Sequence, residues 1–153
     1  MRVIVLMLMA AILTGCAAKR KSATTATAST SGDSRTVAVT MLNNNTYLLA
    51  TASADERYAF SKDFPVKVGG GFGEGPLNER RFLNALLGPE GQQVHYTRMG
   101  SCCGFTTPNS PMGTGLLDRY KVYWEGATDT SYLYLNMYDK GDLFIPKGFT
   151  AKQ

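Results

Sequence analysis

The chain has 153 residues, of which 44 % are hydrophobic and 18 % are charged, and this is enough for one globular domain with its own core. Five of the 16 basic residues but only one of the 12 acidic residues precede Val37, so the net charge of +4 belongs to the N-terminal segment. The rest of the chain has balanced charge, which excludes the basic face of a nucleic-acid-binding protein.

The N-terminus has the pattern of an exported and anchored protein. Met1-Arg2 precedes the apolar run Val3–Leu13, which is too short to span a bilayer because a span takes about 20 residues. The run suits a secretory signal, and Leu13–Cys16 resembles a bacterial lipobox, which implies cleavage before Cys16 and acylation of that cysteine. An ordinary cleaved signal or a short membrane helix is the alternative. Because Ala17-Ala18 follows in place of a retaining aspartate, we expect an outer-membrane anchor that faces the periplasm.

These patterns divide the chain into a signal peptide at residues 1–15, a lipidated cysteine with a Ser/Thr-rich tether at residues 16–36, and one globular domain at residues 37–153. Lys19, Arg20 and Lys21 lie beside the anchor, where each cation gains about 1 kcal/mol from an anionic membrane surface. An incidental solvated charge in a linker fits them equally well.

The first half of the domain predicts short strands and one helix. Residues 37–41 and, more weakly, 46–53 predict strands, and residues 58–68 predict an extended segment whose Pro65 argues for a sheet edge. Residues 69–75 predict a flexible glycine-rich loop that leads into a helix at residues 76–87.

The predicted helix has signals at both ends. Pro76 suits its first position, and Glu79 lies in the positive first turn, where it reads as a solvated charge. Gly88 suits the left-handed position after the last turn, and Pro89 blocks continuation. The apolar stripe that packs the helix on a sheet consists of Phe82, Leu83, Leu86 and Leu87.

The second half predicts an antiparallel arrangement. Residues 92–98 predict a strand and residues 100–115 a long loop, whereas residues 116–125, 131–138 and 143–145 predict a three-stranded meander. One helix beside these strands predicts an α+β domain with a single antiparallel sheet and one main amphipathic helix packed on it.

The glycine-rich loop is a candidate anion-binding site, because free N–H groups at a helix N-terminus attract phosphate. It matches neither the G-x-G-x-x-G pattern nor the P-loop spacing, so a turned linker whose glycines permit close packing is the favoured alternative. The candidate residues are Gly71, Gly73, Gly75, Asn78, Arg80 and Arg81.

The adjacent Cys102 and Cys103 enter an oxidising compartment if the protein is exported. Three states are open: a vicinal disulfide, two reduced packed thiols, or a soft-metal or redox site completed by His95. The disulfide is favoured, because the metal site lacks a visible fourth ligand and the C-x-x-C spacing.

Aromatic residues alternate along the two longer strands of the meander. A tyrosine-rich sheet face suits recognition of glycans or peptides, because the rings offer rigid area with a polar tip. Cross-strand packing that stabilises the sheet itself is the favoured alternative. The residues are Tyr120, Tyr123, Trp124, Tyr132, Tyr134 and Tyr138.

Five motifs follow one another in order: VKVGGG (66–71), GPLNERRFLNAL (75–86), RMGSCC (98–103), GLLD (115–118) and YLNMYD (134–139). Together they resemble a family of small bacterial lipoproteins whose members are sometimes named 2-dehydro-3-deoxyphosphooctonate aldolase. That name implies a lyase, and enzymes with that activity are (β/α)₈ barrels of about 250 residues. The domain here is shorter and has one predicted helix, and the resemblance carries over no catalytic residues.

We therefore expect a membrane-anchored envelope module that binds an envelope protein or a glycan, without catalysis and without a cofactor. The alternative is a small periplasmic redox or metal protein, or an enzyme, that uses Cys102, Cys103 and His95. A hydrolase site is not apparent, since the chain has one histidine and no G-x-S-x-G motif.

Overall fold

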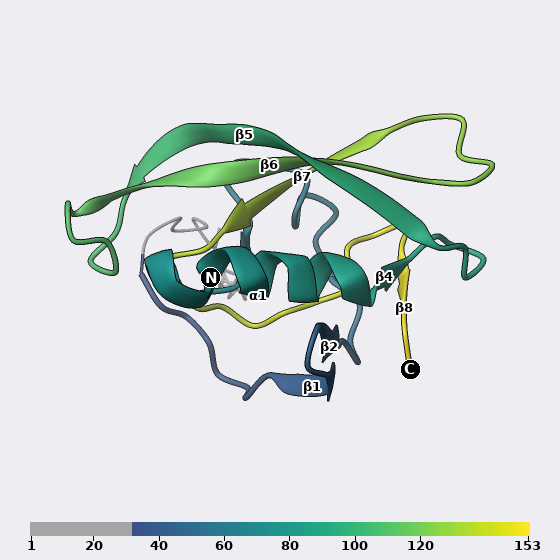
Figure 1. Ribbon diagram of the computed structural model, residues 1–153, viewed down its shortest axis with the longest axis horizontal. Helices are drawn as coiled ribbons and strands as arrows, with labels where there is room; N and C mark the ends of the chain where they lie inside the picture. Colours follow the sequence, from purple (N-terminus) through teal and green to yellow (C-terminus); the bar gives the residue numbers. More distant parts are fainter. Residues whose placement is uncertain (1–31) are drawn as a thin grey trace, which may run out of the picture.

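The computed structural model describes residues 32–153, so the predicted signal peptide, the predicted lipidation site Cys16 and the predicted tether up to residue 31 lie outside the described residues. Within them one helix packs on a four-stranded sheet, with two small sheets beside it (Figure 1), which confirms the α+β prediction. The sheet order is β3-β7-β6-β5, antiparallel except that β3 pairs in parallel with β7. The elements are β1 Thr40–Asn43, β2 Thr46–Leu48, β3 Val66–Lys67, α1 Gly71–Ala85, β4 Leu86–Leu87, β5 Val94–Thr106, β6 Thr114–Trp124, β7 Ser131–Asn136 and β8 Thr150–Ala151.

Helix α1 begins at Gly71, so the predicted glycine-rich loop forms its first turns and Pro76 lies inside it. Gly70 caps the helix in the left-handed conformation, with φ of 107°, and the Gly71 N–H donates to the Met137 carbonyl at 2.8 Å. A Cβ on Gly75 would lie 2.7 Å from the Cβ of Met137. This close packing against the chain that follows β7 outweighs the poor helix propensity of glycine.

The helix ends at Ala85, and Leu86–Leu87 form β4, which pairs with β8 near the C-terminus. The predicted helix end at Leu87 with a left-handed Gly88 is therefore wrong. Gly88 instead leaves room for the indole of Trp124, whose Cγ would lie 3.0 Å from a Cβ at that position. The pairing partner of Leu86–Leu87 is far away in sequence, so local signals do not reveal it.

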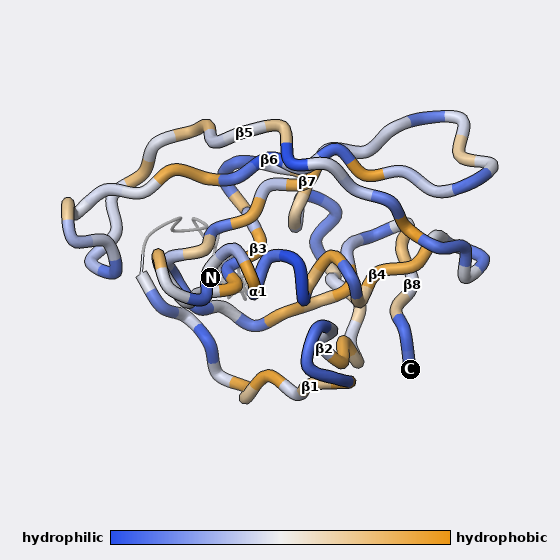
Figure 2. The backbone as a smooth tube through the Cα atoms, in the orientation of Figure 1, coloured by the Kyte–Doolittle hydropathy of each residue, from blue (hydrophilic) through white to orange (hydrophobic). Residues whose placement is uncertain are grey.

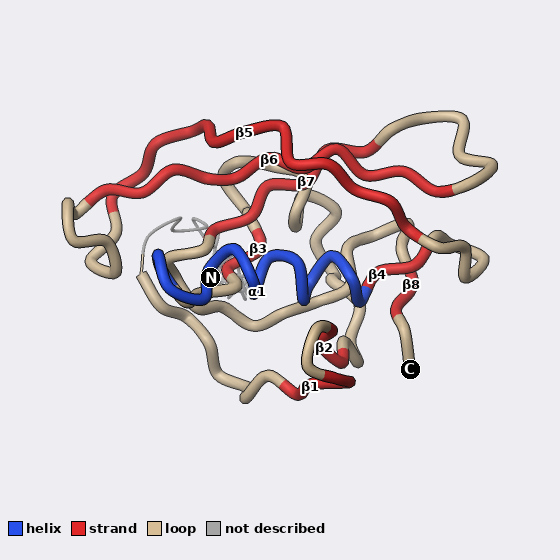
Figure 3. The backbone as a smooth tube through the Cα atoms, in the orientation of Figure 1, coloured by secondary structure: helices blue, strands red, loops and turns tan. Residues whose placement is uncertain are grey.

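The β5–β6 hairpin dominates the sheet and extends beyond both ends of α1 (Figure 3). The predicted loop at residues 100–115 is mostly strand, and only residues 107–113 turn the chain. Two bulges, at Met99 and Cys103, accommodate the residues that predicted a loop. The meander is β5-β6-β7, because the third predicted strand, residues 143–145, makes only a single bridge from Ile145 to Ala52.

The N-terminal strands are shorter than predicted. β1 and β2 form a hairpin that is tied to α1 by hydrogen bonds from Arg81 Nε to the Asn44 carbonyl (3.1 Å) and from Asn84 Nδ2 to the Asn45 carbonyl (2.8 Å). Residues 55–63 form turns in place of an extended segment, and β3 lies at the sheet edge, as Pro65 predicts.

The core lies between α1 and the inner face of the sheet. The buried hydrophobic residues of α1 lie in its C-terminal half, after a polar stretch (Figure 2). Within residues 32–153 no helix is long and apolar enough to cross a membrane. Fully buried core side chains include Val66, Phe82, Leu83, Leu86, Val122, Leu133 and Leu135.

The described chain begins as part of the folded domain. The Ser34 N–H donates to the Lys140 carbonyl at 2.7 Å, and the Arg35 guanidinium donates to the carbonyls of Gly141 (2.7 Å), Lys67 (3.1 Å) and Val68 (3.2 Å). Residues assigned by composition to the end of the tether are thus held against the sheet, and the domain begins a few residues before Val37.

Candidate functional site

A buried polar cluster links α1 to the sheet. Glu79 is fully buried, and its Oε2 accepts a hydrogen bond from the Tyr120 hydroxyl at 2.9 Å. Asp118 forms a two-point ion pair with Arg98, at 2.6 and 2.8 Å, and accepts a hydrogen bond from Ser101 Oγ at 2.8 Å. We call Glu79, Arg98, Ser101, Asp118 and Tyr120 the carboxyl cluster.

The pKa values of the two carboxyl groups in this cluster, Glu79 and Asp118, are shifted in opposite directions. Burial, followed by the neighbouring charge of Asp118, raises the pKa of Glu79 from its ordinary 4.5 to about 8. Burial opposes the ionisation of Asp118, but hydrogen bonds from Arg98 and Ser101 outweigh it and lower the pKa of Asp118. Glu79 is therefore neutral at neutral pH, whereas Asp118 is a carboxylate.

Protonation of Glu79 accounts for the burial of its other carboxyl oxygen. Glu79 Oε1 is buried and no donor reaches it. A neutral Glu79 shares a hydrogen bond with Asp118, which raises the pKa of Glu79 and lowers that of Asp118. The directions of these two shifts indicate that Glu79, and not Asp118, holds the proton between them.

The prediction that Glu79 is a solvated charge is wrong. The earlier start of α1 moves Glu79 from the first turn to the buried middle of the helix, in line with Gly75 and Phe82. That i, i+4, i+7 spacing was the available signal. Because the side chain is fully buried, it has no access to a substrate, and the cluster joins helix to sheet.

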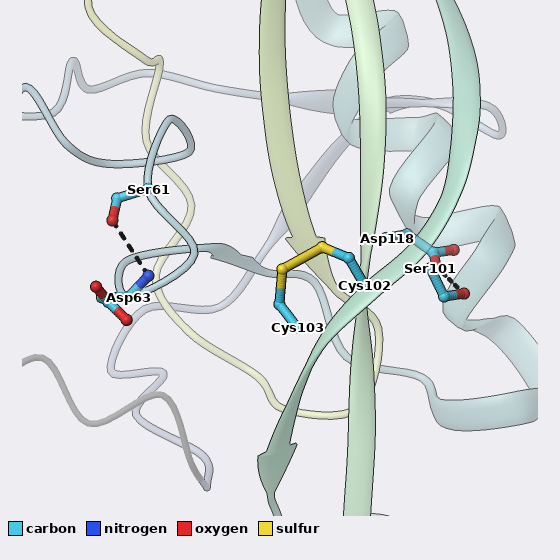
Figure 4. The surroundings of a disulfide bond; sticks show 6 residues. All are labelled: Ser61, Asp63, Ser101, Cys102, Cys103 and Asp118. Carbon is cyan, nitrogen blue, oxygen red and sulfur yellow. Dashed lines mark hydrogen bonds between the residues drawn. A yellow bond between two sulfur atoms is a disulfide. The ribbon is translucent and has the colours of Figure 1, made fainter.

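The structure joins Cys102 and Cys103 in a disulfide, the first of the three states that the sequence left open. The pair lies within β5, next to Ser101 and its hydrogen bond to Asp118 (Figure 4). Cys103 is the extra residue of the bulge and has a left-handed φ of 56°, which only a constrained or unusual non-glycine residue adopts. The disulfide therefore follows Ser101 of the carboxyl cluster directly in sequence, and it constrains the backbone in the C-terminal half of β5.

We expect alkylation without reduction to leave Cys102 and Cys103 unmodified, because both sulfurs are in the disulfide. After reduction in denaturant, two alkyl groups should be added to the domain. Intact-mass spectrometry of both samples measures the difference. Two alkyl groups before reduction would mean free thiols and would contradict the disulfide.

The metal site composed of His95, Cys102 and Cys103 is not assembled. His95 is stacked on Tyr123 with ring centroids 5.5 Å apart, seven positions from Cys102 along the same strand, which is about 23 Å in extended chain. Both sulfurs are oxidised. In residues 32–153 no group of three or more His, Cys, Asp or Glu side chains has metal-binding geometry.

The candidate anion-binding residues of the glycine-rich segment do not come together in one site either. Gly71, Gly73 and Gly75 are within the helix, and Arg80 is exposed. The Asn78 amide donates to the Gly69 carbonyl at 3.0 Å and accepts from Arg81 at 2.9 Å, so these two side chains fix the helix start.

The predicted aromatic residues do not form one face. Tyr120 is in the buried cluster, whereas Tyr123 and Tyr132 are exposed, and the Arg119 guanidinium lies 5.5 Å above the Tyr132 ring. Trp124, the last residue of β6, packs edge-on against Phe149. The remaining members are Tyr134, which is partly buried, and Tyr138, which is buried.

Tyr138 forms the floor of a groove that sequence reasoning missed. Phe72 and Phe105 contact its ring edge-on, with centroids 5.6 and 6.1 Å away. The groove has a volume of about 680 Å³, and its lining comes from the start of α1, from the end of the hairpin where β5 turns into β6, and from the chain after β7. We call it the aromatic groove; its lining residues are Phe72, Gly104, Phe105, Thr106, Met112, Thr114, Gly115, Leu116 and Tyr138.

Two local features build the aromatic groove. A Cβ on Gly115 would lie 2.8 to 2.9 Å from ring atoms of Tyr138 and Phe105, so only glycine lets both rings meet there. The bulge at Cys103 adds one residue to β5, which reverses the side-chain alternation between Cys102 and Phe105. The glycine-rich and cysteine-rich sequence that predicted a loop thus positions aromatic rings.

No protein-family model, curated protein or solved structure matches this chain. Residues 32–153 form one helix on an open four-stranded sheet, which is not the (β/α)₈ barrel that an aldolase name implies.

Proposed function

We propose that this chain is a lipid-anchored bacterial envelope protein whose domain is a non-enzymatic binding module, with the aromatic groove as its binding surface. The observation that carries the proposal is the exposure of apolar side chains around the groove. Met112, Phe72 and Leu116 are 76 %, 61 % and 50 % exposed, and they are three of the four most exposed large hydrophobic residues in the described chain. Clustered exposure of this kind typifies interaction surfaces.

The surface around the floor of the groove is held rigid. Tyr138 is fixed by edge-on contacts with Phe72 and Phe105 and by close packing on Gly115. The disulfide constrains β5 one residue before the lining begins at Gly104. A surface that is already ordered loses little conformational freedom on binding, and this supports a binding role.

The anchor is supported by the lipobox-like run that ends at Cys16. Intact-mass spectrometry of the protein extracted from membranes tests it, with Cys16→Ser as the control. We expect the mass of a chain that begins at Cys16 and carries acyl chains, and we expect Cys16→Ser to lose membrane association. An unmodified Cys16 would contradict the anchor.

Occupation of the aromatic groove is tested by methionine oxidation in intact envelopes and in detergent-extracted protein. Met112 lines the groove, whereas Met99 is 48 % exposed on another part of the hairpin and serves as a matched control. We expect peroxide to convert Met112 to its sulfoxide several-fold more slowly in the envelope than in the extract, because an occupant covers it. Met99 should react at the same rate in both. Equal rates for Met112 would overturn the assignment of the groove.

A thiol–disulfide redox role is the second candidate, because the disulfide is half-buried on an edge strand, where a reductant reaches it. The double variant Cys102→Ser, Cys103→Ser separates the two roles. A redox protein loses all thiol–disulfide exchange in this variant, whereas the binding module loses only part of its protection of Met112, because the aromatic contacts of Tyr138 remain.

A further inference from the structure

We propose that the aromatic groove docks on the lipid bilayer to which the chain is anchored and so holds the domain in one orientation on the membrane. This inference rests on the proposed function, because it names the partner of the same groove. Three observations carry it: where the described chain begins, what lines the groove, and how far the opposite end lies from it.

The described chain begins at the end of the molecule that holds the groove. Asp33 accepts hydrogen bonds from Asn109 Nδ2 at 2.7 Å and from the Lys140 N–H at 2.8 Å. Asn109 is in the same turn as Met112, and Lys140 follows the groove floor Tyr138 by two residues. Figure 1 shows this beginning beside the start of α1 and the turn between β5 and β6. A segment that leads back to Cys16 thus leaves the domain next to the groove.

The length of that segment keeps the groove near the membrane. Cys16 and Gly32 are 16 positions apart in the sequence, and for the tether that the Ser/Thr-rich composition predicts we expect an end-to-end distance of about 20 Å. A surface held this close to a bilayer meets it at high effective concentration, so weak apolar contacts are sufficient for docking. Lys19, Arg20 and Lys21 lie in the same segment and are attracted to anionic headgroups.

The chemistry of the groove fits a lipid surface better than a polar partner. In the part of the chain that the structure describes, its lining contains no charged side chain and consists of aromatic, aliphatic and small residues. Phe72 and Met112 protrude from the rim, which suits insertion at the boundary between headgroups and acyl chains. Because the attraction is apolar, docking should survive high salt, in contrast to binding through the three basic residues alone.

The single tryptophan provides a built-in control. Trp124 is the last residue of β6, and the groove residue Thr114 is the first, so the two ends of this 11-residue strand lie about 33 Å apart. A domain docked through the groove places Trp124 away from the bilayer, whereas a domain that tumbles on its tether exposes both ends equally.

Quenching by brominated lipids tests the orientation. Acylated full-length protein is reconstituted into phosphatidylethanolamine–phosphatidylglycerol vesicles with bromine on the upper acyl carbons. In the variant Phe72→Trp, Trp124→Phe we expect about half of the emission to be lost, because interfacial apolar side chains sink about 5–10 Å into this region. Wild-type emission from Trp124 should change little. If Trp124→Phe does not fold, Phe72→Trp alone is compared with wild type.

The outcomes separate this inference from the proposed function. Adding Met112→Asp and Leu116→Asp should abolish the quenching while the acylated protein still sediments with vesicles. An introduced tryptophan that is not quenched on sedimenting vesicles overturns bilayer docking, and protection of Met112 in envelopes would then assign the groove to a protein or to a second copy. Protein that is neither acylated nor vesicle-bound overturns the proposed function itself.

Discussion

The free energy of unfolding is expected to fall as the pH rises from about 4.5 to about 8, because Glu79 must lose a proton that the folded state holds. The unfolded chain releases this proton near the ordinary pKa of 4.5, whereas burial raises the pKa of Glu79 in the folded protein to about 8. Between these values the folded state binds more protons than the unfolded state, so each pH unit costs at most about 1.4 kcal/mol. The stabilisation is complete below pH 4.5 and is lost as the pH passes 8.

Glu79→Gln removes this dependence, since an amide keeps a donor toward Asp118 and an acceptor for Tyr120 without a titrating proton. Urea denaturation at several values between pH 5 and pH 9 measures it. We expect a steep loss of stability in wild type and a nearly flat profile in Glu79→Gln, which should be the more stable protein at pH 9.

Glu74→Gln is the matched control, because Glu74 lies on the same helix and is exposed. It should leave the profile unchanged. The lowered pKa of Asp118 acts in a different window, since its contribution is lost only as the pH falls through values below 3.8. A Glu79→Gln profile as steep as wild type would show that Glu79 is ionised in the folded protein.

Local sequence signals predicted the α+β class because its evidence is local. Alternation over residues 116–125 and 131–138 and the stripe at Phe82 and Leu83 need no knowledge of distant residues. The helix boundaries failed at both ends for one physical reason. Met137 presses on Gly75 at the start, and β8 captures Leu86–Leu87 at the end, and both partners are remote in sequence.

The candidate site was harder to predict because its residues carry sequence signals that are typical of other structures. Glycine and cysteine over residues 100–104 predict a loop, yet two bulges let a strand contain them. The aromatic groove joins Phe72 from the helix start, Phe105 from β5 and Tyr138 after β7, which no single pattern contains. Glu79 was also misread as a solvated charge, although its spacing to Phe82 places it on the buried face once the helix begins at Gly71.

Asp139→Ala is expected to lower the free energy of unfolding by about 3 kcal/mol, because it leaves two buried donors, those of Thr107 and Asn136, without an acceptor. Asp139 is fully buried and accepts hydrogen bonds from the Thr107 hydroxyl, from Asn109 Nδ2 at 2.9 Å and from Asn136 Nδ2 at 3.0 Å. The stability of Asp139→Asn should lie between those of wild type and Asp139→Ala. One oxygen remains as an acceptor, whereas the new amide faces the donor of Asn136. Urea denaturation at neutral pH ranks the three proteins, and Asp55→Ala, at an exposed ion pair with Arg57, should leave the midpoint unchanged.

The same substitution affects the end of the domain that holds the aromatic groove. Asn109 donates both to Asp139 and to Asp33, so loss of Asp139 loosens the contact that fixes the beginning of the described chain. Protease cleavage near Asp33 should accelerate in Asp139→Ala and not in Asp55→Ala. If bilayer docking depends on the chain leaving the domain beside the aromatic groove, Asp139→Ala should also reduce the bromolipid quenching of a tryptophan at position 72, even where the folded fraction is unchanged. Retention of full quenching with rapid cleavage would mean that the groove finds the bilayer without guidance from the tether.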